Sequence, residues 1–368
     1  MSGISRGSDT RTLPHMVQLD GLRALAVIPV VVHHLLIYYG GVSFNLGAMY
    51  GVKLFFVLSG FLITLILLRS RAACDSSGKS RMLALRVFYT RRVLRIFPLY
   101  YLVVAVAVLV NLEPARKLVW SLVTYTLNFH MGWQGWFEAH FAHFWSLCVE
   151  EQFYIVWPWM ILLVPKQRLL PLVVGISMVS FVLRILLVSS GYTMMTMLGA
   201  YVYPWMNLDT LGGGALLALL WDEPQTRDRA RVILRRYVLP ISLACVATTG
   251  LLLNLGYFDP AFILHDTALA AFFMCAIAAA SSGIKGPAGR VLSWPPVVYI
   301  GRISYGIYVY HPFVPPLVTY AVGVGGTKQE PTGWVGVTLS VLVSGGIASL
   351  SWFAFERPIN RAKRHFRV

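Results

Sequence analysis

Apolar stretches long enough to cross a lipid bilayer dominate this 368-residue sequence and limit what it can fold into. A helix needs about 20 apolar residues to cross the hydrocarbon core, and hydropathy marks about ten such stretches. They are residues 19–39, 50–68, 97–112, 145–164, 169–188, 203–221, 237–255, 261–283, 303–322 and 333–355. Only 12% of the residues are charged, too few for the surface of a soluble domain. We therefore predict an all-α polytopic membrane protein with about ten transmembrane helices. Its expected partners include the lipid bilayer.

The distribution of basic residues orients these helices. With the amino terminus inside, 25 of the 31 Lys and Arg residues fall in segments on the cytoplasmic side. The net charge of +16 therefore indicates cytoplasmic loops and no nucleic-acid partner. This arrangement predicts cytoplasmic termini, with an amino-terminal tail at 1–18, a membrane domain at 19–358 and a basic tail at 359–368. The short apolar piece at 118–129 is expected to form a re-entrant or interfacial helix.

Cysteine spacing and the first residues exclude other classes of protein. The four cysteines have no CxxC spacing, so neither a zinc site nor a disulfide framework is indicated, and no metal is expected. The first eighteen residues have no apolar core followed by a small-residue cleavage site. We expect the first transmembrane helix to serve as the targeting signal.

The first apolar stretch, 19–39, carries ionisable groups. Such groups are costly in hydrocarbon, so they are functional candidates by default. Eleven residues separate Arg23 from His34, which corresponds to about 1100° of helix rotation and places both side chains on one face. Their separation along the axis is about 16 Å. A single ligand that contacts both residues must therefore be long.

A second candidate site is the basic segment before residue 97. Arg91, Arg92 and Arg95 lie within about one helical turn of each other at a membrane entrance. One interpretation is a topology signal that also touches lipid phosphates. The other is a phosphate clamp, because a guanidinium pairs with phosphate in a bidentate way. A nucleotide-bearing ligand such as coenzyme A would suit such a clamp.

Four ionisable groups are expected at one depth. Counted from the inner edge of the hydrocarbon core, His34 lies about 22 Å and Arg184 about 21 Å up. Glu150 and Asp209 lie about 7 and 9 Å below the outer edge. This predicts a polar chamber in the outer half, although ion pairs that only stabilise the fold, such as Arg184 with Asp209, remain an alternative. Lys53 lies close to the outer surface and is expected to extend towards the headgroups.

Two further residues are ambiguous. His311 precedes Pro312 in a stretch where a kinked, locally unwound helix is expected. His311 either takes part in the chemistry or bonds a carbonyl that the kink frees. Trp145 is more simply an interfacial anchor or a packing residue than a stacking site for a substrate.

Six segments in order resemble the motifs of acyltransferase family three, a family of integral membrane acyltransferases. They are LDGLRALAVIPVVVHH, GVKLFFVLSGFLI, RRVLRIFPLYY, FWSLCVEEQFY, GRISYGIYVYH and FERP, and they extend over residues 19–358. The resemblance implies an enzyme of the bacterial plasma membrane that moves an acyl group, usually acetyl, from cytoplasmic acyl-CoA to a hydroxyl. The implied acceptor is a cell-envelope glycan, a lipid-linked sugar or a similar molecule.

The resemblance also implies roles for single residues. His34 is the expected general base, with Glu150 accepting the other ring proton. Direct transfer and an acyl-histidine intermediate both remain open. The remaining candidates are Arg23, Arg91, Arg92 and Arg95 for the acyl-CoA donor, and Trp145, Asp209 and His311 for the substrate. Two positions depart from the family pattern, because Lys53 stands where an aspartate is common and Asn207 where an arginine often precedes the aspartate.

Other classes of membrane protein also place ionisable groups mid-membrane. A proton-coupled transporter or flippase would move its substrate without consuming a thioester. A structural membrane protein would use the buried groups for stability alone. The clustered arginines beside a helix that carries Arg23 and His34 favour the enzyme over both.

Overall fold

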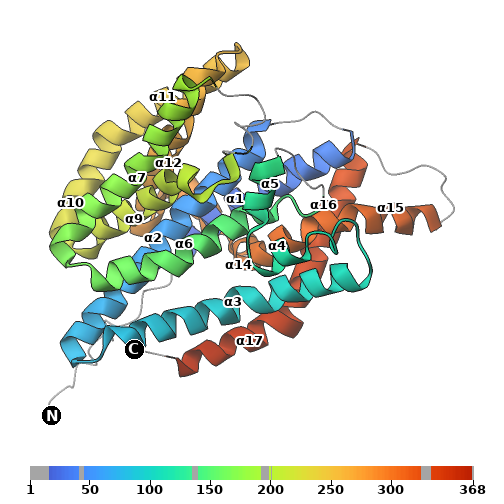
Figure 1. Ribbon diagram of the computed structural model, residues 1–368, viewed down its shortest axis with the longest axis horizontal. Helices are drawn as coiled ribbons and strands as arrows, with labels where there is room; N and C mark the ends of the chain where they lie inside the picture. Colours follow the sequence, from blue (N-terminus) through green and yellow to red (C-terminus); the bar gives the residue numbers. More distant parts are fainter. Residues whose placement is uncertain are drawn as a thin grey trace.

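The computed structural model describes residues 16–40, 45–134, 140–191, 199, 201–324 and 333–366. These residues fold into helices and connections without any β-strand, which confirms the predicted all-α class (Figure 1). The elements are α1 (Val17–Tyr38), α2 (Asn45–Ser77), α3 (Arg81–Leu109), α4 (Val119–Val123), α5 (Leu127–Gln134), α6 (Phe144–Leu163), α7 (Lys166–Ser189), η1 (Pro204–Met206), α9 (Leu208–Asp222), α10 (Pro224–Ile233), η2 (Leu234–Val238), α11 (Leu239–Asn254), α12 (Phe258–Ser282), α13 (Gly286–Leu292), α14 (Pro295–Tyr310), η3 (His311–Phe313), α15 (Val314–Val324), α16 (Gly333–Ser351), η4 (Trp352–Glu356), α17 (Arg357–Arg361) and η5 (Ala362–His365).

Seven helical stretches among the described residues are long and apolar enough to cross a membrane. They are Val17–Tyr38, Gly47–Ser77, Arg81–Leu109, Lys166–Ser189, Pro224–Asn254, Phe258–Ser282 and Gly333–His365. The other predicted stretches also form helices, but α9 has only 15 residues and the stretch at 303–322 is interrupted between α14 and α15. Helix α3 begins at Arg81 rather than at residue 97, because the basic segment continues the helix. The short piece at 118–129 forms the short helix α4 and the start of α5.

Helix α2 lies at the centre of the bundle and approaches α9 backbone to backbone. A side chain at Gly60 would collide with the carbonyl of Leu211, and one at Gly214 would collide with that of Val57. Small residues allow such close helix packing where no hydrophobic effect drives association within the lipid. Helices α7 and α9 to α12 gather on one side of the molecule and α3, α14, α16 and α17 on the other (Figure 1).

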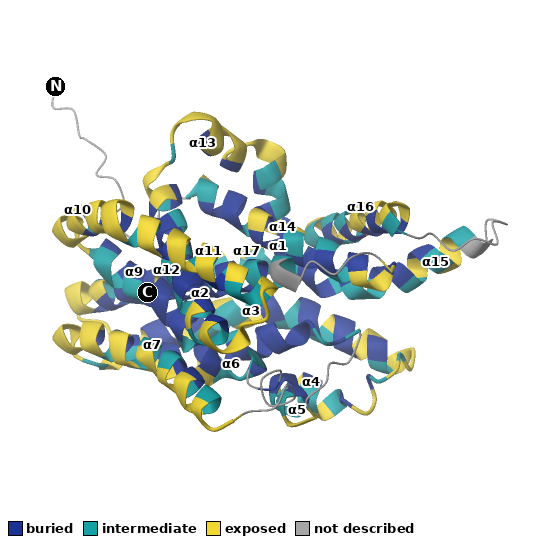
Figure 2. Cartoon of the chain, turned by 90° about the horizontal axis from the view of Figure 1, so that it is seen from above, coloured by how far each residue is buried: buried dark blue, intermediate teal, exposed yellow. Residues whose placement is uncertain are grey.

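Burial is greatest in the middle of the bundle and least on the outer helices (Figure 2). The outward faces of α7, α11 and α16 expose large apolar side chains such as Leu186, Ile241 and Leu342. In water such faces would be unfavourable, whereas a lipid bilayer solvates them. The outer surface therefore has the character expected of a membrane protein.

Helix α1 is attached to its neighbours at both ends. Near its start, the Gln18 amide donates to the Ile284 carbonyl at 2.9 Å and accepts from the Ile284 N–H at 2.7 Å. Just beyond its end, the Tyr39 hydroxyl lies 2.8 Å from the hydroxyl of Ser340 in α16. The helix that carries Arg23 and His34 is thus held in place along its axis.

Candidate active site

The break after α14 brings His311 against His34 of α1. Pro312 has no backbone N–H, so the Tyr308 carbonyl four residues earlier lacks its usual helical donor. His311 Nδ1 lies 2.7 Å from that carbonyl oxygen, and His311 Nε2 lies 2.8 Å from His34 Nδ1. The two rings are stacked, with centroids 5.1 Å apart and planes 4° apart. The predicted bond between His311 and a freed carbonyl is present, and the same ring also contacts His34.

These contacts define which ring nitrogens carry protons. A carbonyl oxygen only accepts, so His311 Nδ1 is the donor to Tyr308. In a neutral ring the opposite nitrogen is an acceptor, so His311 Nε2 accepts from His34 Nδ1. His34 Nε2 is then the nitrogen with the lone pair. His311 is fully buried and His34 only partly so, which leaves the lone pair on the more accessible ring.

His143 is a third histidine of this site, and it was not singled out from the sequence. Its ring lies 5.2 Å from that of His311 and 5.4 Å from that of Tyr308, centroid to centroid. The residue is buried, and among the described residues its ring nitrogens make no hydrogen bond of good geometry, although the Val309 backbone lies within reach. A buried polar group without a partner is costly and marks a functional candidate. The only sequence signal was its place directly before the FWSLCVEEQFY segment.

The hydroxyl of Tyr308 links His143 to α6. It donates to the His143 carbonyl at 2.7 Å and lies 2.6 Å from the hydroxyl of Ser146. Two histidine rings, those of His143 and His311, thus lie beside Tyr308. No group of three or more His, Cys, Asp or Glu side chains in the described ranges is arranged to bind a metal ion. The site consists of imidazole and hydroxyl groups.

Glu150 belongs to a different network from the one predicted. Its carboxylate bonds the hydroxyls of Ser59 and Tyr154, which also bond each other. The expected contact with His34 is therefore not the one observed, since the ring partner of His34 is His311. The depth estimate was compatible with a contact, but two residues at one depth can face different neighbours.

Trp145 has the environment of a packing residue. It is buried, meets the Phe56 ring edge-on at 6.0 Å and lies 5.0 Å from the Tyr201 ring. The Lys53 ammonium is 5.0 Å from the centroid of the same Tyr201 ring. Tyr201 thus connects Trp145 to a cluster of buried charges.

This charged cluster contains the predicted pair of Arg184 and Asp209. The same Asp209 oxygen accepts from Thr267, and Asp209 is buried. The expectation for Lys53 was wrong, because its side chain is fully buried rather than extended to the surface. Its ammonium lies 2.5 Å from a carboxylate oxygen of Asp266, because an oppositely charged partner within the bundle replaces contact with water.

The two departures from the family pattern are in direct contact. Lys53 Nζ donates to the side-chain oxygen of Asn207 at 2.7 Å. Where the family commonly has an acidic and a basic residue, this chain has a basic and a neutral one. Asp266 lies beside the Lys53 ammonium, so the two unusual positions belong to one cluster.

The basic residues expected to bind a donor lie at the end of the bundle where α1 begins. Arg23 pairs with Asp20 at 2.8 Å, and Arg302 of α14 lies 3.8 Å from the same carboxylate. The arginines of α3 are not a single clamp. Arg91 and Arg95 are exposed and Arg92 is half-buried, and Arg92 and Arg95 line two separate cavities.

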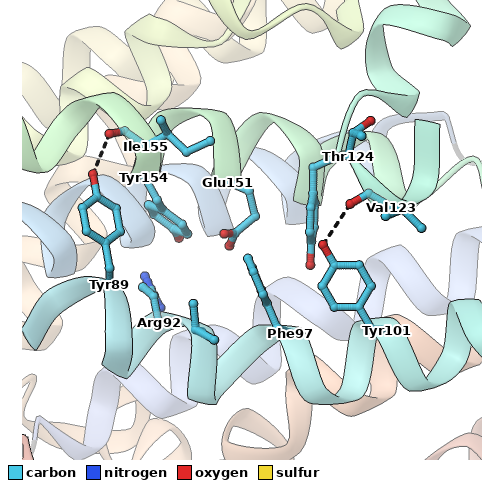
Figure 3. Close-up of a pocket in the computed structure, with 11 residues that line it drawn as sticks. Tyr89, Arg92, Phe97, Tyr101, Val123, Thr124, Glu151, Tyr154 and Ile155 are labelled. Atoms are coloured by element: carbon cyan, nitrogen blue, oxygen red, sulfur yellow. Dashed lines mark hydrogen bonds between the residues drawn. The ribbon is translucent and has the colours of Figure 1, made fainter. Parts of the chain in front are cut away.

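Figure 3 shows the cavity on the Arg92 side of α3. Its volume is about 260 Å³, and Arg92, Phe97 and Tyr101 face α6 across it. The Arg92 guanidinium lies 4.2 Å from the centroid of the Tyr154 ring. The buried carboxylate of Glu151 points into the same space, so the second glutamate of the pair faces this cavity while Glu150 faces α2.

Fold and site together describe a helical bundle with membrane-length apolar helices, a histidine pair inside the bundle and several arginines near one end. The sequence model of acyltransferase family three, described as an acyltransferase domain, matches residues 16–352. The chain therefore belongs to this family, which confirms the resemblance stated above.

Several relatives of the chain have names that refer to acetyl transfer. It is 29% identical over 370 residues to the peptidoglycan O-acetyltransferase OatA of Listeria monocytogenes, covering 94% of this chain and 56% of the relative. It is 29% identical over 376 residues to the putative peptidoglycan O-acetyltransferase YrhL of Bacillus subtilis, covering 93% and 54%. A putative O-acetyltransferase of Staphylococcus aureus is 26% identical, with 95% and 58% covered. The chain thus spans little more than half the length of these relatives. No solved structure matches it significantly.

Proposed function

We propose that this protein transfers an acyl group, in the first instance acetyl, from acyl-CoA to a hydroxyl group of a cell-envelope glycan such as peptidoglycan. The observation that carries the proposal is the bonded pair of His34 and His311, which leaves a lone pair on His34 Nε2. The family and the names of the relatives support an acyltransferase that acts on hydroxyl groups.

In this proposal His34 is the general base. Its Nε2 takes the proton of the acceptor hydroxyl while the hydroxyl oxygen bonds the carbonyl carbon of the thioester. The carbon–sulfur bond breaks, and the imidazolium returns the proton to the departing thiolate. His311 accepts the hydrogen bond from His34 Nδ1 throughout, which is the orienting role that a carboxylate has in a hydrolase triad.

We further propose that the bundle crosses the bacterial plasma membrane about ten times with both termini in the cytoplasm. The distribution of basic residues supports this orientation. It places Arg23, Arg92 and Arg95 near the cytoplasmic end, where an acyl-CoA donor arrives. Arg23 and His34 share α1, so a donor whose phosphates lie near Arg23 directs its thioester end along α1. The acceptor then enters from the opposite side of the membrane.

Release of free thiol from acetyl-CoA tests the proposal. Protein in lipid nanodiscs is assayed with and without peptidoglycan fragments, as wild type and as His34→Ala. We expect thiol release that depends on the acceptor and falls by at least about 100-fold in the variant, the lower range for loss of a general base. His365→Ala, which changes an exposed histidine, is the matched control.

Two results would count against the enzyme. Normal turnover by correctly inserted His34→Ala protein would exclude this residue as the base. Movement of a substrate across the membrane without consumption of thioester would instead support a proton-coupled transporter or flippase.

A further inference from the structure

A cavity of about 220 Å³ lies on the Arg95 side of α3. Three parts of the chain that are far apart in sequence meet there: α3, α14 and the continuous η4–α17–η5 segment. Arg95, Arg302 and Lys363 contribute the cationic side chains of its wall. Neither Arg302 nor Lys363 was among the candidates from the sequence.

The cavity has more positive than negative charge. Glu356 is the carboxylate in its wall, and this buried group already accepts a hydrogen bond from Ser351 at 3.0 Å. Arg95 makes no salt bridge with any described residue. The nearby Arg91 and Arg92 add to the positive potential at Lys363. Arg95 and Arg302 are exposed and Lys363 is half-buried, so three cations border one solvent-facing cavity, and an excess of positive charge there favours binding of an anion.

The residues that line the cavity favour a nucleotide over a simple inorganic ion. Trp352 and Tyr305 add aromatic rings to the wall, and Asn360 adds an amide beside Lys363. Aromatic side chains stack on nucleobases, while arginine and lysine bind phosphate. These groups together suit a ligand that carries both a planar base and phosphates.

The position of the cavity relates it to the histidine pair. Tyr305 in its wall lies six residues before His311, which is about 9 Å along the axis of α14. Arg302 also lies beside Asp20, the partner of Arg23, so the cavity adjoins the first turns of α1. A ligand with its phosphates in the cavity thus has its remaining length available to approach His34.

We propose that Arg95, Arg302 and Lys363 bind the phosphates of the nucleotide end of the acyl-CoA donor, with Trp352 beside the base. This assignment rests on the proposed function, because it takes the donor to be a coenzyme A thioester. It divides the arginines of α3 between two tasks, with Arg95 contacting the donor and Arg92 facing the cavity of Figure 3.

Equilibrium binding of coenzyme A and of adenosine 3′,5′-bisphosphate tests this assignment without requiring turnover. We expect Arg302→Gln and Lys363→Gln each to weaken both ligands by at least about tenfold, the lower range for a hydrogen bond to a charged group. Pantetheine, which lacks phosphates, should bind these variants and the wild type equally. Arg290→Gln and Arg364→Gln remove exposed basic residues outside the cavity wall and are the matched controls.

The outcomes separate this inference from the proposed function. Wild-type protein that binds neither nucleotide overturns both. Unchanged nucleotide binding by Arg302→Gln and Lys363→Gln overturns the cavity assignment alone. Nucleotide binding by a His34→Ala protein that no longer transfers acyl groups supports a donor site separate from the histidine pair. A lipid headgroup is the alternative ligand of the cavity, and it is tested in nanodiscs with and without phosphatidylglycerol. The assignment is overturned if wild type retains this lipid, Lys363→Gln does not, and both bind coenzyme A equally.

Discussion

Replacement of Lys53 by methionine removes one cation from a buried cluster of four charges. Lys53 and Arg184 are balanced there by Asp209 and Asp266, and Lys53 is fully buried. Without Lys53, Asp266 retains only Arg184, whose guanidinium lies 3.6 Å away and already pairs with Asp209. Loss of one partner from a buried pair costs about 3–5 kcal/mol. At about 2 °C per kcal/mol for a large chain, Tm should fall by about 6–10 °C.

Buried cysteines make this shift measurable in detergent. Cys74, Cys148 and Cys275 are free and buried, so a fluorogenic maleimide reacts with them only as the bundle opens. The double variant Lys53→Met with Asp266→Asn removes both charges and should recover most of the loss. Lys285→Met, an exposed substitution, should leave Tm unchanged.

The family pattern provides a second arm of the same experiment. Lys53→Asp with Asn207→Arg restores an acidic and a basic residue but leaves the cluster with one excess negative charge. Adding Asp266→Asn makes it neutral, so we expect the triple variant to be more stable than the double. Two results would refute the argument from charge balance. One is a Tm within about 2 °C of wild type for Lys53→Met. The other is equal stability of Lys53→Asp/Asn207→Arg with and without Asp266→Asn.

The remaining predictions concern the histidine pair and are read from initial rates of thiol release. His311→Phe preserves a ring but removes both hydrogen bonds, so kcat should fall by at least about tenfold with little change in donor affinity; an unchanged kcat would exclude a positioning role. Pro312→Ala supplies an N–H that competes for the Tyr308 carbonyl, so kcat should fall about fivefold, as for loss of about 1 kcal/mol, without a fall in Tm. A fully active, equally stable variant would contradict this account.

The sequence predicted features that depend on one helix alone, and it also predicted one ion pair between two helices. The interruption near His311 followed from Pro312, and the bond to a freed carbonyl followed from the missing N–H. The pairing of Arg184 with Asp209 followed from charge and depth, because two opposite charges at the same depth in hydrocarbon lower their desolvation free energy most by pairing with each other.

The other contacts between helices could not be predicted in the same way. His34 and His311 are 277 residues apart, and helix periodicity gives a face but not the neighbour that covers it. The depth estimate placed Lys53 near the surface because it counts residues along one axis and contains nothing about the inward direction. His143 was missed because a lone histidine before an aromatic segment has no spacing that indicates a site.

The attachment of α1 at both ends has a consequence for how substrates reach His34. Gln18 and Tyr39 bond the helix to its neighbours near both ends, and Arg23 and His34 lie on this one continuous helix. A transporter needs elements that move between two states. A helix bonded near both ends instead keeps a constant distance between Arg23 and His34. Under the proposed function, the spacing of Arg23 and His34 selects a donor by the distance from its phosphates to its thioester carbon. Acyl-CoA donors that differ only in the acyl group should therefore bind with similar Kd values.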